Sequence, residues 1–304
     1  MRRRVVRQGA ATYTISLPAK WIREFGIKAG GELNVQERGK EVVISPERVV
    51  SEKRREINVT GLEPNLVRHY IQSMYIRGVD EITITSSDPK LLKVAQSMGD
   101  SLIGMAIVEQ KGNAVILREV SIPKHEEFDA LMRRVFFSIK SIGEESLDRL
   151  KAKDWSGLSE MKLAERASVG RITQLCMRML NKEGYVEFSK TAAMFDIVRI
   201  LENIGDEYTL LNEYLAEATT KPSGDTLEMY KKVNDLIDDV YLILYKFDKE
   251  RLSATYQKIK RIRRAEMDRI IMKKSKEEAI VLHRLRKISE LMGSILEEMM
   301  IVSL

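Results

Sequence analysis

The sequence contains a single cysteine, Cys176, so no disulfide can form within the chain. A chain without disulfides fits a reducing compartment, and we expect a cytoplasmic protein. No run of about 18 uncharged apolar residues occurs, so we expect no membrane-spanning helix. The basic start MRRRVVRQGAATYTISLP is followed by neither an apolar run nor a small-residue cleavage site, so a secretory signal is not expected either.

Acidic residues are absent from the first 23 positions, although the whole chain has 45 Asp and Glu. Six basic residues occupy that stretch: Arg2, Arg3, Arg4, Arg7, Lys20 and Arg23. Residues 126–257 carry 19 Lys and Arg against 24 Asp and Glu, whereas residues 258–304 carry 12 against 7. A basic end attached to an acidic middle indicates that the end contacts a polyanion, and we expect the six basic residues to contact the phosphates of DNA.

Residues 1–47 have the pattern of a small β-rich unit. Apolar and polar residues alternate over residues 13–17, as in a half-buried strand, and Pro18 suits the first turn of a short helix. Two further strands on either side of Gly39 are expected to form a hairpin. Because about 47 residues bury little core alone, we expect this unit to form an interlocked homodimer.

A second unit is expected within residues 48–124. Residues 48–56 have the composition of a charged linker, and residues 56–122 predict strands and helices in the order β-α-β-α-β-β. The two helices start at Pro64 and after Asp88, where proline and an acidic capping residue favour a first turn. This order predicts a small open α/β sandwich.

The remainder of the chain has apolar residues at helical spacing and little glycine or proline. The one strong break, Pro222–Gly224, divides it into repeats of about 125–221 and 225–304, each long enough for three helices. The segment EESLDRLKAKDWSGL around Asp154 is similar to DDVYLILYKFDKERL around Asp248. We therefore expect a duplicated three-helix unit.

No set of catalytic side chains can be named. The histidines, His69, His125 and His283, lack metal-ligand spacing, and Cys176 lies in an apolar helical pattern typical of a core residue. Neither a phosphate-cradling glycine loop nor a G-x-S-x-G or zinc signature is present. We expect a protein that is not an enzyme.

Two carboxylates in RILENIGDEY, Glu202 and Asp206, lie four positions apart and project from one helix face. Such a pair suits a metal ion that prefers oxygen ligands. The spacing alone equally fits a solvated helix face, because the pair Glu144 and Asp148 shares it.

A second charged segment, KIKRIRRAEMDR, crowds basic residues onto one expected helix: Lys258, Lys260, Arg261, Arg263 and Arg264. The crowding fits the solvated face of a long helix. It also fits a contact with DNA, an acidic partner or a membrane surface.

The segment VVRQGAATYTISLPAKWIREFGIKAGGELNVQERGKEVVISP resembles the SpoVT/AbrB swapped-hairpin domain. A strand, an SLPKxW-like helix start, a GIxxGDxL-like turn and a hairpin follow one another over residues 3–46. The resemblance implies that two chains interlace through residues 1–47 into one DNA-binding barrel. Gly31 departs from the family, which usually has Asp there, and the family also includes antitoxins that neutralise toxins.

The motif R-x-L-E-x-I-G-D over residues 199–206 resembles the third-helix motif of PhoU proteins, which restrain phosphate uptake and phosphate signalling. The segments GLEPNLVRHYIQSMYIRGVDEITI and SLIGMAIVE resemble the spacer of archaeal PhoU-like proteins with an AbrB-type N-terminus. The resemblance implies a multidomain α+β chain with an AbrB-like domain at 1–47, an α/β spacer at 48–124 and a bundle of two three-helix repeats at 125–304.

Some PhoU proteins bind metal clusters through E-x-x-x-D pairs, so the resemblance implies a divalent or iron-type metal ion at Glu202 and Asp206. In the second repeat Arg286 and Glu290 stand at these positions, which argues against a full two-site cluster. A single metal with outside ligands, or a structural ion pair between Glu202 and Arg199, are both open.

Two functions follow. The first is a phosphate-responsive transcriptional regulator that binds DNA as a dimer and relays phosphate status through the bundle, with a phosphate transporter or signalling protein as a further partner. The alternative is a metal-binding or transporter-regulating PhoU-like protein whose AbrB-like part only dimerises.

Overall fold

The structure is a computed structural model that describes residues 2–38, 41–46, 53–121, 125–218 and 222–303. These residues divide into two compact units, Met1–Ser51 and Glu52–Leu304. The expected domain boundaries at 47–48 and 124–125, and the expected turn at Gly39, fall at stretches outside the described residues.

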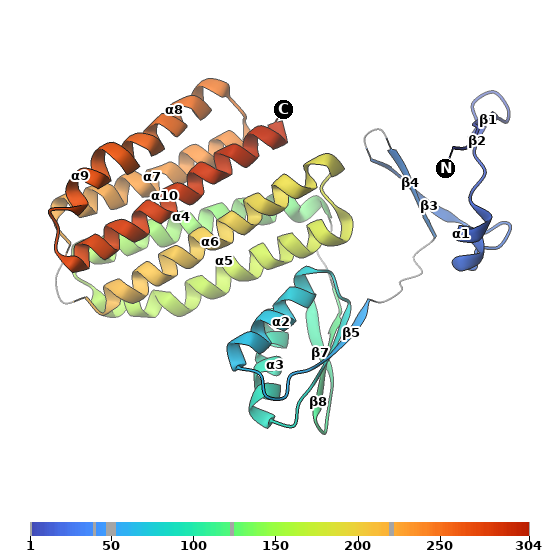
Figure 1. Cartoon of the computed structure of the whole chain (residues 1–304), viewed down its shortest axis with the longest axis horizontal. Helices are drawn as coiled ribbons and strands as arrows, with labels where there is room; N and C mark the ends of the chain where they lie inside the picture. Colours follow the sequence, from blue (N-terminus) through green and yellow to red (C-terminus); the bar gives the residue numbers. More distant parts are fainter. Residues whose placement is uncertain (1, 39–40, 47–52, 122–124, 219–221, 304) are drawn as a thin grey trace. The chain divides into compact units, whose positions relative to one another are not determined.

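The first unit consists of two antiparallel hairpins and a short helix (Figure 1). Its elements are β1 (Val6–Arg7), β2 (Tyr13–Thr14), α1 (Ala19–Glu24), β3 (Leu33–Arg38) and β4 (Glu41–Pro46). The helix start at Pro18 is confirmed, and Gly26 follows the helix with a φ of 62°, which glycine adopts without strain. The strand expected over residues 13–17 is shorter, because pairing with β1 covers only Tyr13 and Thr14.

The second unit begins with a four-stranded sheet and two helices. Its elements are β5 (Arg54–Asn58), α2 (Pro64–Ile76), β6 (Glu81–Thr85), α3 (Pro89–Ser101), β7 (Met105–Lys111) and β8 (Ala114–Glu119). The strand order is β5-β6-β8-β7, with β5 parallel to β6 and the other neighbours antiparallel. The expected order of strands and helices is therefore confirmed.

The expected linker over residues 48–56 needs a correction, because β5 already starts at Arg54. The side chains of Arg54, Arg55 and Glu56 are exposed, which made this stretch look like a linker. Their main chains pair with β6, where Arg54 lies opposite Glu81. Backbone pairing of an edge strand leaves little trace in side-chain composition.

The core of this part lies between one face of the sheet and the helices α2 and α3, which Figure 1 shows on the same side of the sheet. Ile82 pairs with Leu117, and Ile84 pairs with Val115, so that these four buried side chains share one face. Gly99 on α3 lies against the sheet so closely that an added Cβ would approach Leu117 Cδ2 to 2.7 Å. The arrangement is a two-layer α/β sandwich.

The rest of the second unit is helical, as expected from the periodicity. Its elements are η1 (His125–Glu127), α4 (Phe128–Ala152), α5 (Trp155–Glu183), η2 (Phe188–Lys190), α6 (Thr191–Ala216), α7 (Gly224–Tyr245), α8 (Lys249–Lys260), the π-helical segment η3 (Arg261–Met267), α9 (Asp268–Ile271) and α10 (Lys276–Ser303). Asp154 caps α5 by accepting from Gly157 N, and Asp248 caps α8 by accepting from Arg251 N. The two similar sequence segments thus start their helices in the same way; a duplication of PhoU type stays a prediction.

One continuous apolar core runs through the helical region, with α6 packed against both α5 and α10. Gly205 permits the close approach of α6 to α5, because an added Cβ would lie 2.9 Å from Val169 Cγ1. The buried carboxylate of Glu207 fastens α6 to α10 through Arg284 at 2.9 Å and Lys287 at 2.5 Å. Within the described ranges, no helix combines the length and apolar character needed to span a membrane.

Candidate functional site

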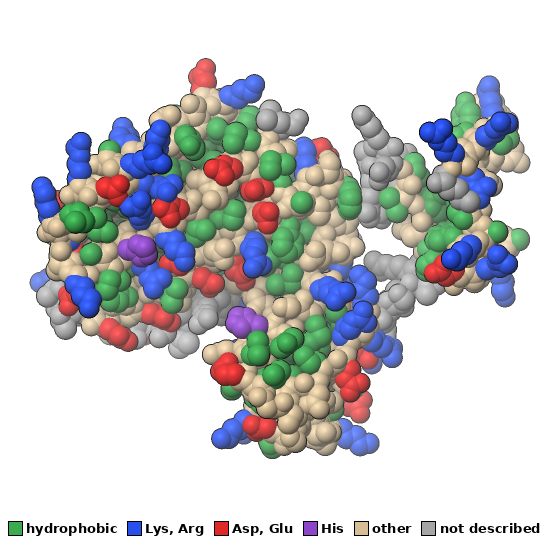
Figure 2. Space-filling model, viewed as in Figure 1, with side chains coloured by type: hydrophobic (Ala, Val, Ile, Leu, Met, Phe, Trp, Pro, Cys, Tyr) green, Lys and Arg blue, Asp and Glu red, His purple; other side chains and the backbone are tan. Residues whose placement is uncertain are grey.

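The six basic residues expected to contact DNA all lie exposed in the first unit. Arg2, Arg3 and Arg4 precede β1, Arg7 belongs to β1, and Lys20 and Arg23 belong to α1. Figure 1 shows the β1–β2 hairpin and α1 apart from each other, joined by an extended stretch of chain. One copy of the chain therefore presents two basic groups rather than a single patch, as the blue side chains of this unit in Figure 2 also show.

The acidic side chains that the structure describes do not neutralise these basic residues. Arg7 donates from Nε to Gly9 O at 3.1 Å and from Nη2 to Ala10 O at 2.9 Å, and Arg23 donates from Nε to Ala19 O at 3.3 Å. With the acidic residues that the structure describes, none of the six forms an ion pair. Their charge is therefore free to face an external polyanion.

The residues of the first unit whose exposure is described form no core in a single copy. Among residues 2–35 and 42–46, whose exposure is described, none is buried. Large apolar side chains are instead exposed, including Val5 at 63%, Tyr13 at 65% and Val42 at 60%. Two isolated two-stranded hairpins with this exposure do not hold a fold alone, so this unit requires a covering surface.

Comparison with known families explains this architecture. Residues 6–52 match the family described as antidote-toxin recognition MazE, bacterial antitoxin. Comparison of the chain with curated proteins gives no match. The first unit is thus a MazE/AbrB-like, antitoxin-type DNA-binding domain, and such domains bind DNA and dimerise. This domain indicates a DNA-binding regulator; the match ends at residue 52, so the PhoU-like character of the later segments stays a prediction.

The expected carboxylate pair lies on α6, with Glu202 half-buried and Asp206 exposed. Gln174 of α5 donates from Nε2 to Glu202 Oε1 at 3.2 Å. Burial raises the pKa of Glu202, and the negative charge of Asp206 acts in the same direction; Gln174 and Arg199 oppose the shift in part. The structure therefore places Glu202 in a site that disfavours its charged form.

A metal ion needs more ligands than this pair supplies. Protein sites for zinc typically use four ligands, and calcium sites take about six to eight oxygens. Over the described residues, no group of three or more His, Cys, Asp or Glu side chains could hold a metal. Glu202 and Asp206 thus do not form a metal centre from this set alone, and a site completed by outside ligands stays a prediction.

The corresponding positions of the second half carry an ion-pair network. Arg286 Nη1 lies 2.5 Å from Asp268 Oδ1, and Arg286 Nε lies 3.3 Å from Glu290 Oε1. Arg263 Nη2 donates to the same Glu290 oxygen at 2.7 Å. In the second half, an arginine thus replaces one carboxylate of the pair, and the other, Glu290, is held by two arginines.

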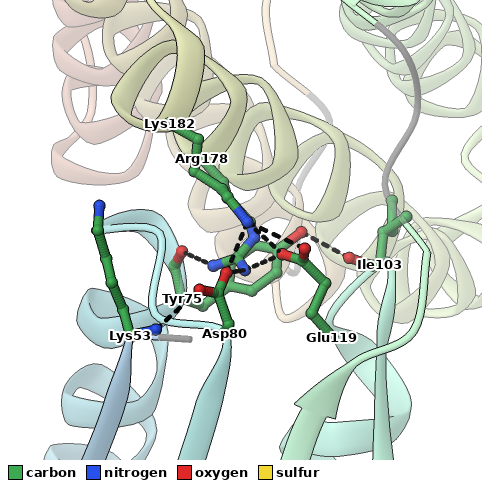
Figure 3. A network of polar contacts seen from close by, with 7 residues as sticks. All are labelled: Lys53, Tyr75, Asp80, Ile103, Glu119, Arg178 and Lys182. Carbon is green, nitrogen blue, oxygen red and sulfur yellow. Dashed lines mark hydrogen bonds and ion pairs between the residues drawn. The ribbon is translucent and has the colours of Figure 1, made fainter. Parts of the chain in front are cut away.

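The structure also reveals a buried polar network that the sequence did not predict, between α5 and the α/β sandwich (Figure 3). Arg178 is only 1% exposed and donates from Nη1 to the main-chain oxygen of Tyr75 at 2.6 Å. Its Nη2 contacts Glu119 and lies 3.6 Å from Asp80 Oδ1. Lys182, one turn further along α5, lies 2.6 Å from Asp80 Oδ1 and 2.8 Å from Glu119 Oε2.

Asp80 connects this network to the start of β5, because its Oδ2 accepts from Lys53 N at 2.9 Å. Burial acts to raise the pKa of Asp80, but the hydrogen bonds from Lys182 and Lys53 N outweigh it and lower the pKa below its ordinary value. The carboxylate is thus held in its charged form between two elements. A sequence signal for this network is lacking, because its members are ordinary charged residues far apart in the chain.

Proposed function

We propose that the protein is a dimeric, cytoplasmic transcriptional regulator that binds DNA through its first unit and receives a phosphate-related signal through its helical region. The observation that carries the proposal is the MazE/AbrB-like domain with six exposed basic residues that lack acidic partners among the described residues. The chain acts as a binding protein and not as an enzyme.

The missing core of the first unit supports dimerisation. Two copies that interlace their hairpins would cover the exposed apolar side chains and pair the open strand edges. A two-fold arrangement would also double both basic groups. Such a dimer suits a DNA site with two-fold symmetry.

The network in Figure 3 supports a relay from the helical region toward the DNA-binding domain. Arg178 and Lys182 hold α5 against Asp80, and Asp80 holds the main chain of Lys53. Lys53 is the first described residue of the second unit. A shift of α5 would disturb this hold on Lys53, and the proposal is that the signal ends as a change in the relative placement of the two DNA-binding units.

The phosphate part of the proposal is supported by the resemblance of residues 199–206 and of the spacer segments to PhoU-like proteins. A phosphate transporter or a phosphate-signalling protein is the partner that this resemblance implies. The alternative is a metal-binding or transporter-regulating protein whose first unit only dimerises. It differs in one measurable respect, because it requires no affinity for DNA.

The test is DNA binding by the full-length protein to the promoter of its own operon, at salt concentrations from about 50 to about 200 mM. Substituting Arg4→Ala together with Arg7→Ala should weaken binding and lower the salt slope by about one for each lost phosphate contact. Arg251→Ala, which removes an exposed arginine of α8, is the matched control and should change neither quantity. An unchanged affinity and slope in the double variant would reject the proposed interface.

A further inference from the structure

A pocket of about 380 Å³ lies between α10 and the stretch formed by α8 and η3. One wall carries three basic residues, Lys260, Arg263 and Arg264, from the basic segment that DNA binding by the first unit leaves unexplained. The facing wall on α10 carries Glu290, Ser294 and Glu297. The pocket thus combines a cationic wall with a wall of hydrogen-bond acceptors.

The cationic wall is built at an irregular place in the helix. Residues Arg261–Met267 form a π-helical segment, a rare geometry that recurs at functional sites. Lys260 and Arg264 lie four positions apart, where like charges repel each other along a helix. In the described part of the chain, neither residue forms an ion pair that would relieve this repulsion. A bound anion would relieve it.

Arg263, which also lines the pocket, is only partly satisfied by protein groups. Its Nη2 donates to Glu290, but its Nε is buried and has no hydrogen-bond partner among the described residues. A buried N–H without an acceptor is unfavourable, and most such groups in proteins are satisfied by protein, water or ligand. Because this Nε is buried, a ligand would contact Arg263 through the part of its guanidinium that lines the pocket.

We propose that this pocket binds a phosphorylated small molecule of about nucleotide size, with its phosphate group on Lys260, Arg263 and Arg264. Arginine forks and lysine ammonium groups are the side chains that recognise phosphate. A free phosphate ion would leave most of the 380 Å³ unfilled, whereas the volume suits a small organic ligand.

The remaining lining residues fit the organic part of such a ligand. Glu290, Ser294 and Glu297 can accept hydrogen bonds from its hydroxyl or amino groups. Tyr256 and Ile259 also line the pocket and offer an aromatic ring and an aliphatic surface. The two carboxylates would oppose a bare, highly charged anion, so they favour an ester that carries hydrogen-bond donors over inorganic phosphate.

This proposal rests on the proposed function, because it names the chemical class of the effector that the regulator would bind. α10 packs on α6, α6 packs on α5, and α5 carries Arg178 and Lys182. A ligand that moved α10 would therefore act on the relay through two helix–helix contacts. Binding itself can be measured without DNA, so a failure of this inference and a failure of DNA binding are separate results.

The test is isothermal titration calorimetry of the full-length protein with adenosine 5′-monophosphate, glucose 6-phosphate, inorganic phosphate and adenosine. At least one of the two esters should bind once per chain and at least tenfold more tightly than inorganic phosphate, and adenosine should bind weakly or not at all. Lys260→Gln and Arg264→Gln should each lower ester affinity about tenfold, which corresponds to the loss of one charge-assisted contact.

Two controls separate the pocket from other basic surfaces. Arg269→Gln removes an exposed arginine of α9 that does not line the pocket, and Arg7→Ala removes a charge of the first unit; both should leave ester affinity unchanged. The inference is overturned if neither ester binds, or if Lys260→Gln and Arg264→Gln bind as well as the unmodified protein. Equal affinity for inorganic phosphate and the esters would overturn the assignment of an organic part.

Discussion

The guanidinium of Arg178 on α5 donates a 2.6 Å hydrogen bond to the main-chain oxygen of Tyr75 on α2, and its central carbon lies 4.8 Å from the centroid of the Tyr75 ring. The same residue of the α/β sandwich thus receives both a hydrogen bond and a cation–π contact from the helical region. Glu119 and Asp80 supply the opposite charge. The buried side chain of Arg178 therefore holds the helical region and the α/β sandwich together.

Replacing this arginine should be costly for stability. Arg178→Met leaves Glu119 and Asp80 one cation short and leaves the oxygen of Tyr75 without its donor, so we expect a loss of about 3–5 kcal/mol in the free energy of unfolding. Urea denaturation followed by far-ultraviolet circular dichroism measures the change. Arg171→Met, on the exposed side of the same helix, should stay within about 0.5 kcal/mol of the unmodified protein. Equal losses of unfolding free energy in both variants would show that the buried network contributes no more to stability than an exposed arginine does.

Asp80 should make stability depend on pH. Its pKa is lowered in the folded protein, so its stabilising effect is complete above the ordinary value of 3.8 and is lost as the pH falls through the lowered value. Asp80→Asn removes this effect. The difference in unfolding free energy between the two proteins should be largest near pH 7 and shrink below about pH 4. Denaturation curves at several pH values test this, and a difference that grew toward acid would contradict it.

Replacing each of two glycines on neighbouring helices by alanine should change the free energy of unfolding in opposite directions. At Gly205 an added Cβ would lie 2.9 Å from Val169 Cγ1, so Gly205→Ala should cost about 1–2 kcal/mol through overpacking, after the gain in helix propensity. At Gly170 the nearest atom, Gln174 Nε2, is 3.6 Å away. Gly170→Ala should therefore stabilise the protein by up to about 1 kcal/mol. The same sign of change at both positions would contradict the close approach of α5 and α6.

Dimerisation should depend on the exposed apolar side chains of the first unit. Ile15→Asp places a charge on a side chain that is 49% exposed in one copy and that an interlocked dimer would cover. We expect a monomer by light scattering and a loss of DNA binding. Val186→Asp changes a side chain that is 73% exposed outside this unit and should leave the dimer intact. A dimer that survived Ile15→Asp would place the interface elsewhere.

The predicted metal site can be tested by elemental analysis of the purified protein. A site completed by outside ligands at Glu202 and Asp206 should bring metal through purification, and Glu202→Ala should remove it. Asp235 and Asp239 on α7 form another carboxylate pair with the same spacing, so Asp235→Ala is the positional control and should leave the metal content unchanged. Negligible metal in the unmodified protein and in Glu202→Ala would reject the ligand role.

Local signals in the sequence were sufficient to predict most helices and strands of the second unit. Pro64 and Asp88 start their helices where expected, because capping and the fixed φ of proline act within one turn. In β6 the apolar Ile82 and Ile84 alternate with Thr83 and Thr85, a local pattern typical of a strand with one buried face. The start of β5 was missed, because an edge strand with exposed charged side chains is formed by main-chain pairing alone.

The sequence by itself determined the local elements, the basic and acid-free N-terminus and the family of residues 6–52, because periodicity, caps and motif spacing all act over a few neighbouring positions. Only the tertiary structure decided which charged residues lie together. Arg178 lies 103 positions from Tyr75 and 59 from Glu119. Burial of a charge is favourable only where its partners converge, and that convergence is a property of packed helices and sheet rather than of any segment.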